Sequence, residues 1–119
     1  MQSVDDLLRK NLEAFGERDA EKRRAAISAI WRSEGVLVDP DGKHLGLKAI
    51  DDAIEHLLQK FPDFVFSELS APDSHNGIGR MTWGFGLAQK IPTVTGLDVI
   101  VSMGGKIKTL YTFLDRAPR

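Results

Sequence analysis

The sequence predicts an α+β domain in which helices cover one face of a strongly curved, mostly antiparallel sheet. Apolar residues recur at helical spacing through most of the first half of the chain, and they alternate along strand-like segments in the second half. Large apolar residues share one side of the segment 81–87, while Gly84 and Gly86 occupy the other, which indicates a bend or a close approach of backbone. A chain of 119 residues has the size of one domain, spanning residues 1–119.

Three helices are expected from apolar stripes and from residues that start or stop a helix. The first covers residues 3–16, between an N-cap serine and a glycine. Asn11 lies on its apolar stripe, so this amide points toward the core and needs a hydrogen-bond partner. The second covers residues 19–35 and turns Trp31 inward. The third covers residues 47–61 and is closed by the proline that follows.

The strands are predicted from apolar alternation and from turn residues. A short strand over residues 35–39 precedes a tight turn at residues 40–42 and a return strand at residues 44–45. Beyond residue 62 the apolar period changes to two, and short connectors predict an antiparallel meander. Its strands are expected near residues 64–69, 77–89, 93–103 and 106–114.

The sheet has a second face that helices on one side cannot cover. Alternation projects six large apolar residues onto this face, and so much apolar surface seldom stays in water. We therefore expect a homodimer packed sheet to sheet, with burial by a loop of the same chain as the alternative. The six residues are Leu97, Val99, Val101, Ile107, Tyr111 and Phe113.

Composition narrows the classes of partner. Apolar residues form 42% of the chain, charged residues 28%, and the formal net charge is -1, as in an ordinary globular protein. Nothing indicates nucleic acid, and the basic run at residues 22–24 is interpreted as the solvated side of a helix. The absence of cysteine excludes disulfides and thiolate sites. Acids near Met1 and the lack of a long apolar stretch favour a cytoplasmic protein without a membrane partner.

Asp98 is the most informative polar residue, because it is the only ionisable group between residues 93 and 106. Both faces of its strand are expected to be buried, and an unpartnered carboxylate is costly out of water. Asp98 is therefore hydrogen-bonded, neutral or held in a pocket for chemistry. The sequence leaves these alternatives open, with Tyr111, Trp31, Trp83 or the backbone as donors.

Asp39 is the second carboxylate of interest, at the end of a predicted strand. Its string Asp-Pro-Asp-Gly is also what a tight turn requires, so turn duty is the leading interpretation and chemistry the second. His44 and His75 fall in predicted turns and are interpreted as surface residues. No histidine pair has ligand spacing and no glycine run opens a helix, so neither a metal nor a cofactor is expected.

Three local strings and the order of elements resemble the nuclear-transport-factor-2-like, or SnoaL-like, superfamily over nearly the whole chain. The strings are residues 74–79, 97–100 and 38–40, and they match the ketosteroid isomerases most closely. The resemblance implies a cone-shaped, cystatin-like α+β barrel with an apolar pocket. It also implies that Asp39 is the general base and that Asp98 donates a hydrogen bond to an oxyanion, one ionised and one kept protonated.

Two positions depart from the isomerase pattern. Asn11 stands where those enzymes have a tyrosine, and Leu114 stands where they have an aromatic residue. An amide is a weaker donor than an acidic phenol, so stabilisation of an enolate should be weaker. The ligand-binding residues that the resemblance implies are Asn11, Phe15, Trp31, Ala53, Met81, Trp83, Phe85, Leu110 and Leu114.

The leading hypothesis is a dimer that binds a small apolar molecule with a carbonyl group. Asp39 and Asp98 would move a proton beside that carbonyl, in an isomerisation or a polyketide-cyclase-like ring closure. One alternative is a non-catalytic ligand-binding or dimeric interaction module. A lower-ranked alternative resembles limonene epoxide hydrolase, whose Asp-Arg-Asp relay activates water. Arg80 is the only arginine in residues 64–114, and alternation turns it away from Trp83.

Overall fold

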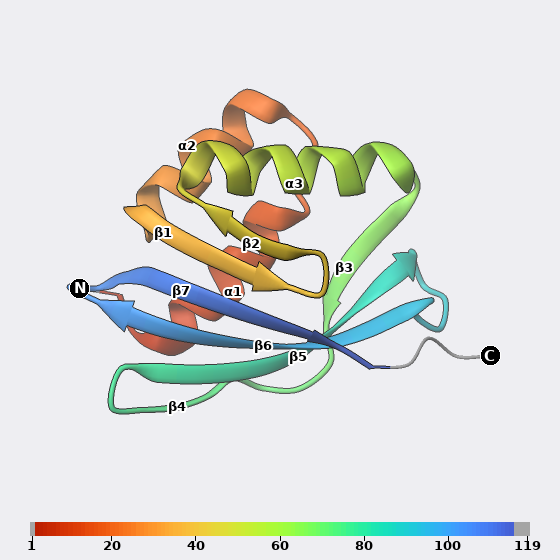
Figure 1. Ribbon diagram of the computed structural model, residues 1–119. Helices are drawn as coiled ribbons and strands as arrows, with labels where there is room; N and C mark the ends of the chain where they lie inside the picture. The colour runs from red at the N-terminus through yellow and green to blue at the C-terminus, as the bar shows by residue number, and fades with distance from the viewer. Residues whose placement is uncertain (1, 116–119) are drawn as a thin grey trace.

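The computed structural model describes residues 2–115 and has three helices packed against one curled sheet (Figure 1). This confirms the α+β class and the curved sheet. The helices are α1 (Val4–Phe15), α2 (Ala20–Ile30) and α3 (Leu47–Lys60). The strands are β1 (Trp31–Asp39), β2 (Gly42–Leu45), β3 (Phe64–Glu68), β4 (Asp73–His75), β5 (Ile78–Leu87), β6 (Val94–Met103) and β7 (Lys106–Leu114).

The strands form a seven-stranded sheet in the order β2-β1-β7-β6-β5-β3, with β4 paired to β5 outside this order. β1 and β7 run parallel, while the other described pairs run antiparallel. β4 lies in a segment that was predicted to be a turn between two strands. Asn76 and Gly77 have φ angles of 50° and 77°, the left-handed geometry of a two-residue hairpin, so the segments on both sides of them pair.

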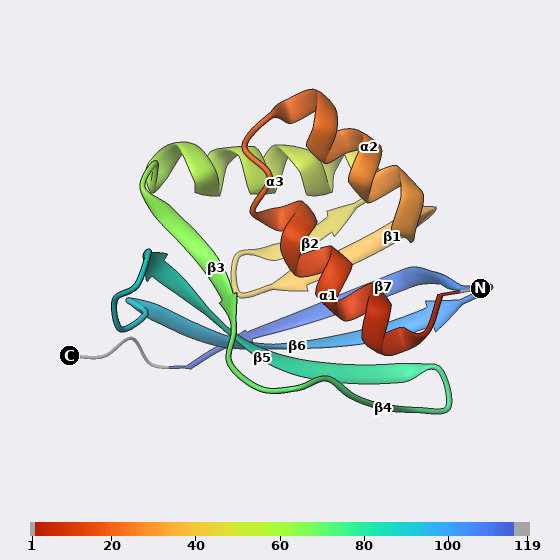
Figure 2. The ribbon, with the colours of Figure 1, turned by 180° about the vertical axis from the view of Figure 1, so that it is seen from behind.

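The helices cover one face of the sheet, which we call the inner face. It carries Leu37, Met81, Ile100 and Leu110, all at most 3% exposed. Figure 2 shows α1 lying along this face over β5, β6 and β7, with α2 and α3 at the end formed by β1 and β2. The opposite side of the same strands is called the outer face.

The second helix ends earlier than expected, at Ile30, and Trp31 begins β1 in extended conformation. The expected helix over 19–35 was wrong here because no apolar residue continues the stripe after Trp31 until Val36. The inward placement of Trp31 is confirmed, since it is 1% exposed. Within residues 2–115 no helix has the length and apolar character needed to cross a bilayer.

Arg23 corrects the interpretation of residues 22–24 as a solvated run, because its side chain is fully buried. Its Nε donates to Asp51 Oδ1 at 2.7 Å, and its terminal nitrogens donate to Glu55 at 3.2 Å and to the Glu17 carbonyl at 3.0 Å. These partners satisfy the guanidinium and attach α2 to α3. A buried charge needs such partners, which lie too far along the chain to be read from local charge pattern.

Ile107 was expected on the outer face and is instead fully buried on the inner side. The register of β6 and β7 shifts there, because Val101 pairs with Thr109 while the next residue, Ser102, pairs with Ile107. This shift is a β-bulge in which Lys108 is the extra residue. Because of the extra residue, Ile107 points to the inner face and not to the outer face, where simple alternation would place it.

Gly84 and Gly86 confirm the close approach of backbone predicted for β5. A Cβ at Gly84 would lie 2.5 Å from Pro92 Cγ, and one at Gly86 would lie 2.7 Å from the nitrogen of Thr93. The segment before β6 therefore folds onto the bare side of β5, which needs glycine at both positions.

Candidate functional site

Four side chains form a row across the inner face, one from each of four neighbouring strands. Asp98 on β6 pairs with Thr112 on β7 and with Met81 on β5. The last registered pair between β1 and β7 is Val38 with Tyr111, so the next residue of β1, Asp39, lies beside Thr112 of β7. Asp39 and Asp98 lie on strands that are two strand spacings apart, so their backbones are separated by roughly 10 Å. We call this set the carboxylate row: Asp39, Thr112, Asp98 and Met81.

Asp98 is 5% exposed, and two side chains donate to the same carboxylate oxygen. Trp83 Nε1 and Thr112 Oγ1 each lie 2.9 Å from Asp98 Oδ1. Burial raises the pKa of Asp98 from 3.8 to about 6, while the hydrogen bonds from Thr112 and Trp83 oppose this rise. Asp98 is thus hydrogen-bonded, and its raised pKa of about 6 gives it a neutral fraction near neutral pH that an ordinary aspartate lacks.

The two hydrogen bonds determine which oxygen of Asp98 carries a proton. Oδ1 accepts from both donors, and an oxygen with both acceptor positions in use has little capacity for a third hydrogen. When Asp98 is protonated, the hydrogen therefore lies on Oδ2. A neutral Asp98 can donate one hydrogen bond from that oxygen, which is the chemistry an oxyanion requires.

Gly96 allows Trp83 to reach Asp98. A Cβ at Gly96 would lie 2.3 Å from Trp83 Cζ2, so the indole ring lies directly on the backbone of β6. The ring nitrogen then meets the carboxylate two residues further along the same strand. The string Gly-Leu-Asp in β6 therefore has a geometric reason: glycine receives the ring and aspartate accepts its N–H.

Asp39 has two partners at the end of β1. Its Oδ1 accepts from the backbone nitrogen of Asp41 at 2.9 Å, which is the turn duty predicted for it. Both of its oxygens also lie 3.2 Å from His44 Nε2 on β2. The Asp39 and His44 side chains are 22% and 23% exposed, so the pair is partly shielded from water.

Asn11 finds the hydrogen-bond partner that the sequence required. Its Oδ1 accepts from Trp31 Nε1 at 2.9 Å, and the residue is 1% exposed. Trp31 lies on Gly35 as Trp83 lies on Gly96, with a Cβ at Gly35 only 2.5 Å from the indole. The amide nitrogen of Asn11 is the group left to donate to another molecule.

Comparison with known proteins identifies the family. No family model and no curated protein sequence matches the chain. The crystal structure of a proposed isomerase of the SnoaL-like family from Agrobacterium tumefaciens is 30% identical, with a TM-score of 0.86, over 92% of this chain and 95% of that one. The chain belongs to the SnoaL-like family. The superfamily resemblance drawn from the sequence is thereby confirmed.

More distant structures share the fold of this SnoaL-like protein. A proposed polyketide cyclase from Sinorhizobium meliloti has a TM-score of 0.73 at 19% identity, over 94% of this chain and 99% of that one. A proposed ketosteroid isomerase from Kribbella flavida has a TM-score of 0.73 at 12% identity, over 96% and 78%. At these identities the likeness establishes the cone architecture and leaves activity to be argued from the site.

The wall residues that the family resemblance implies differ in burial. Leu114, at the end of β7, is 49% exposed, whereas the inner-face residues nearest Asp98 are almost fully enclosed. The set comprises the buried Asn11, Trp31, Met81, Trp83, Phe85 and Leu110, the half-buried Phe15 and Ala53, and the exposed Leu114. The carboxylate row and most of the expected wall thus share one face.

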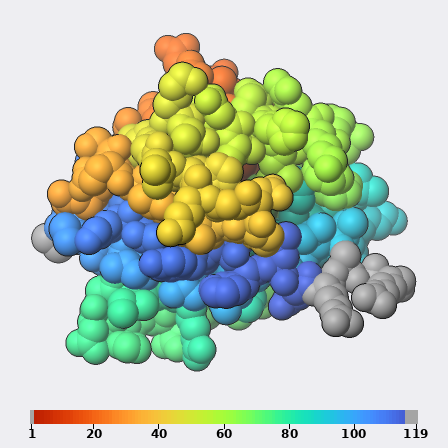
Figure 3. Space-filling model, viewed as in Figure 1, coloured from red at the N-terminus to blue at the C-terminus, as the bar shows by residue number. Residues whose placement is uncertain are grey.

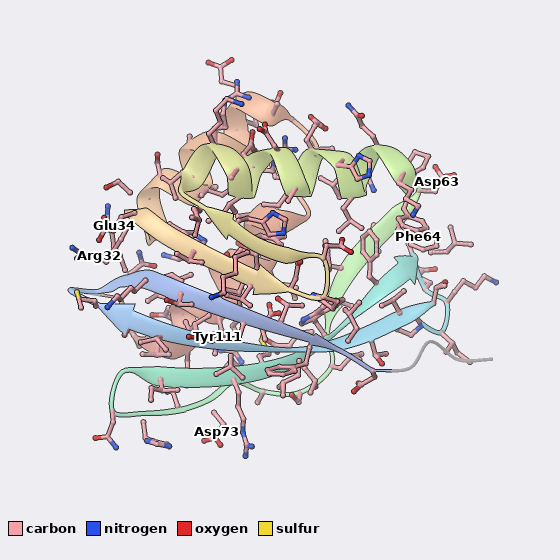
Figure 4. The ribbon with its side chains drawn as sticks, viewed as in Figure 1. Arg32, Glu34, Asp63, Phe64, Asp73 and Tyr111 are labelled. Carbon is pink, nitrogen blue, oxygen red and sulfur yellow. The ribbon has the colours of Figure 1, made fainter. Side chains whose placement is uncertain are left out.

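An aromatic cluster closes one end of this face. Phe85 contacts the rings of Phe61, Phe64 and Phe66, with centroid separations of 5.9, 5.2 and 4.3 Å. Figure 4 shows Phe64 where α3 passes into β3. Phe66 also meets Trp83 edge to face at 5.5 Å, so the cluster reaches the tryptophan that holds Asp98.

Two hollows described on the surface lie away from the carboxylate row. One, of about 300 Å³, is lined by Arg32, Glu34 and Lys106 among others, and Figure 4 shows the first two together at the start of β1. The other, of about 570 Å³, lies between α1 and β3. Figure 3 shows a narrow gap between the yellow atoms of β2 and the green atoms of α3, beside the hairpin that carries Asp39 and His44.

Arg80 has no place in the carboxylate row. It is exposed and pairs with Asp73 at 3.3 Å, with both side chains 67% exposed. This agrees with the predicted orientation away from Trp83 and gives the epoxide hydrolase alternative no inner-face arginine from that position. Among residues 2–115 no group of three or more histidine, cysteine, aspartate or glutamate side chains could hold a metal ion.

Sequence reasoning missed Thr112 and misplaced His44. Thr112 belongs to the site only through the register of β6 with β7, which no local pattern reveals. His44 was interpreted as a surface residue, but β2 places it opposite Leu37, so it shares the inner face with Asp39. His75 also lies in a strand, β4, and is exposed as expected.

Proposed function

We propose that this SnoaL-like protein binds a compact apolar molecule with a carbonyl group and transfers a proton on the carbon beside it. The observation that supports the proposal most strongly is the buried Asp98, whose Oδ1 holds two donors and whose Oδ2 is left to carry a proton. A carboxyl group of raised pKa that shares one apolar face with a second carboxylate is typical of acid and base pairs.

The mechanism assigns one carboxyl group to each end of the reacting unit. Asp98 donates from Oδ2 to the carbonyl oxygen, while Asp39 removes a proton from the adjacent carbon. The electron pair of the broken C–H bond moves toward the oxygen and forms an enol or enolate, which the Asp98 hydrogen bond stabilises. Where the substrate has a C=C bond next to the reacting carbon, the enolate is a dienolate, and Asp39 returns the proton to the far end of that bond, which completes an isomerisation. Alternatively the enolate carbon attacks a second carbonyl of the same molecule, and the alkoxide formed takes the proton back from Asp39, which closes a ring.

Asn11 adds a weaker donor to the same face. Its Oδ1 is occupied by Trp31, so only the amide nitrogen can reach a ligand. A neutral amide stabilises developing negative charge less than an acidic phenol does. We therefore expect modest rates and a preference for ketones whose α-protons are already acidic.

The test uses 2-tetralone, a compact apolar ketone, and 2-naphthol, the stable aromatic counterpart of its enol. Proton NMR in D₂O measures exchange of the α-protons, and quenching of tryptophan fluorescence measures binding of 2-naphthol. Asp39→Asn should abolish catalysed exchange and keep binding, whereas Asp98→Asn should slow exchange by about a hundredfold, as expected for loss of an oxyanion donor. Asp41→Asn changes the same charge in the neighbouring turn and should behave like the wild type.

Exchange by Asp39→Asn at the wild-type rate would remove Asp39 from the mechanism. A second candidate, non-catalytic ligand binding, is favoured by Asn11 at the position of the isomerase tyrosine. It predicts that 2-naphthol binds while the wild type exchanges 2-tetralone no faster than buffer does.

We also propose that a second copy of the chain covers the outer face. Tyr111 and Phe113 are 40% and 58% exposed there, beside the half-buried Leu97, Val99 and Val101. Figure 4, which views this face, shows Tyr111 on it. A contiguous apolar face of this kind is typical of an interface between subunits.

A further inference from the structure

Asp39 and His44 lie side by side because of the β1–β2 register. Leu37 pairs with His44, and Asp39 pairs with Gly42 at the hairpin. Paired residues of an antiparallel ladder share a face, so His44 shares the face of Leu37, and Asp39, two residues further along β1, shares it too. The histidine ring therefore meets the carboxylate diagonally, on the inner face of the cone.

The contact fixes the role of the ring nitrogen. Both oxygens of an ionised Asp39 are acceptors, and both lie 3.2 Å from His44 Nε2, so this nitrogen must carry the hydrogen. Whenever the ring is neutral, its lone pair is then on Nδ1. The pairing predicts a specific tautomer, with hydrogen on Nε2, that the surrounding turn alone would not impose.

The hydrogen bonds of Asp39 leave one of its two oxygens able to accept a proton. Oδ1 accepts from both Asp41 N and His44 Nε2, whereas Oδ2 accepts from His44 alone. Oδ2 therefore keeps one acceptor position for an incoming proton. Contacts to both oxygens restrain rotation of the carboxylate toward solvent.

We propose that His44 is the positioning residue for Asp39: its Nε2–H holds the carboxylate so that Oδ2 faces the substrate. This inference rests on the proposed function and adds a residue to it. His44 does not take the substrate proton. It fixes the orientation of the group that does, and a base misplaced by about 1 Å loses as much as a hundredfold in rate.

Three variants test this in the 2-tetralone exchange assay. His44→Ala removes the donor and should lower the exchange rate about ten- to a hundredfold while 2-naphthol binds as before. His44→Gln places an amide N–H near the position of Nε2 and should restore most of the rate. His56→Ala removes a histidine from the exposed side of α3 and should change nothing.

A second readout does not depend on activity. Ring ¹⁵N NMR of the ligand-free protein should show His44 with hydrogen on Nε2, and Asp39→Asn should shift the tautomer because its amide can itself donate. Wild-type exchange in His44→Ala, or the same tautomer with and without the Asp39 carboxylate, would overturn the inference. Absence of exchange in the wild type would instead overturn the proposed function, and the tautomer comparison would still decide whether His44 holds Asp39.

Discussion

The indole nitrogen of Trp83 donates a 2.9 Å hydrogen bond to the carboxyl group of Asp98 on the neighbouring strand. The bond opposes the effect of burial, because it favours the ionised form that the apolar surroundings disfavour. Burial is the larger influence, so the pKa of Asp98 remains raised. The balance between burial and the hydrogen bonds to Asp98 sets the fraction of Asp98 that is protonated, and therefore able to donate, at a given pH.

Replacement of Asp98 by asparagine should remove a pH dependence of stability. The pKa of Asp98 is 3.8 without its surroundings and about 6 in the folded protein, so the folded state binds more protons between these values. The free energy of unfolding therefore falls as pH rises through this window and then levels off, by about 3 kcal/mol at most. Asp98→Asn should lack this fall, and above about pH 6 it should be more stable than the wild type. Urea unfolding at several pH values measures the free energy of unfolding of the two proteins. The same change of this free energy with pH in the variant and in the wild type would contradict the prediction.

Thr112→Val should raise the pKa of Asp98 further above about 6. Valine keeps the shape of threonine but cannot donate, so the ionised carboxylate loses one of its two hydrogen bonds. Carbon-13 NMR of the carboxyl group measures the pKa directly. Thr109→Val, elsewhere on β7, serves as the control and should leave Asp98 unchanged. A pKa that falls or stays the same in Thr112→Val would show that this hydroxyl does not stabilise the charge.

Gly96→Ala should destabilise the fold by about 2–3 kcal/mol, because overpacking forces a well-packed ring to move. The new Cβ would lie 2.3 Å and 2.7 Å from Trp83 Cζ2 and Cε2. Displacing the indole should also weaken its hydrogen bond to Asp98. Gly16→Ala is the matched control, since its Cβ would meet neighbours at ordinary distances of 3.6 and 3.7 Å. Chemical unfolding gives the comparison, and equal stabilities would mean that the ring is free to shift.

Phe113→Glu should weaken self-association of the protein. Phe113 is 58% exposed on the outer face, and a charge there opposes burial against a second copy. Val65→Glu alters an exposed apolar residue on β3 and should leave association unchanged. Sedimentation equilibrium measures the self-association of both variants and of the wild type. A wild type that stays monomeric at every concentration tested would end the dimer proposal.

Much of the architecture could be predicted from local pattern. Apolar stripes define α1 and α3, an N-cap serine starts α1, and glycines in β5 indicate the close approach of the following segment. Asp98 stood out because no other charge accompanies it in an apolar strand. Such features depend on neighbours in the chain, which a sequence displays directly.

The remaining features depend on pairings between distant segments. Arg23 is buried because Asp51, 28 residues away, meets it. Ile107 faces inward because a bulge changes the register of β7 with β6. Thr112 and His44 enter the site only when strand register places them beside Asp98 and Asp39. Register is a property of the folded sheet, and a shift of one residue turns every side chain to the other face.

The most direct test of the account is a carboxyl ¹³C titration of Asp98 with and without 2-naphthol. Asp98 should titrate near pH 6 in the free protein, and its pKa should rise when the ligand oxygen accepts the hydrogen bond from Oδ2. A pKa close to the ordinary 3.8 that does not respond to 2-naphthol would contradict the central claim that Asp98 is the proton donor of this site.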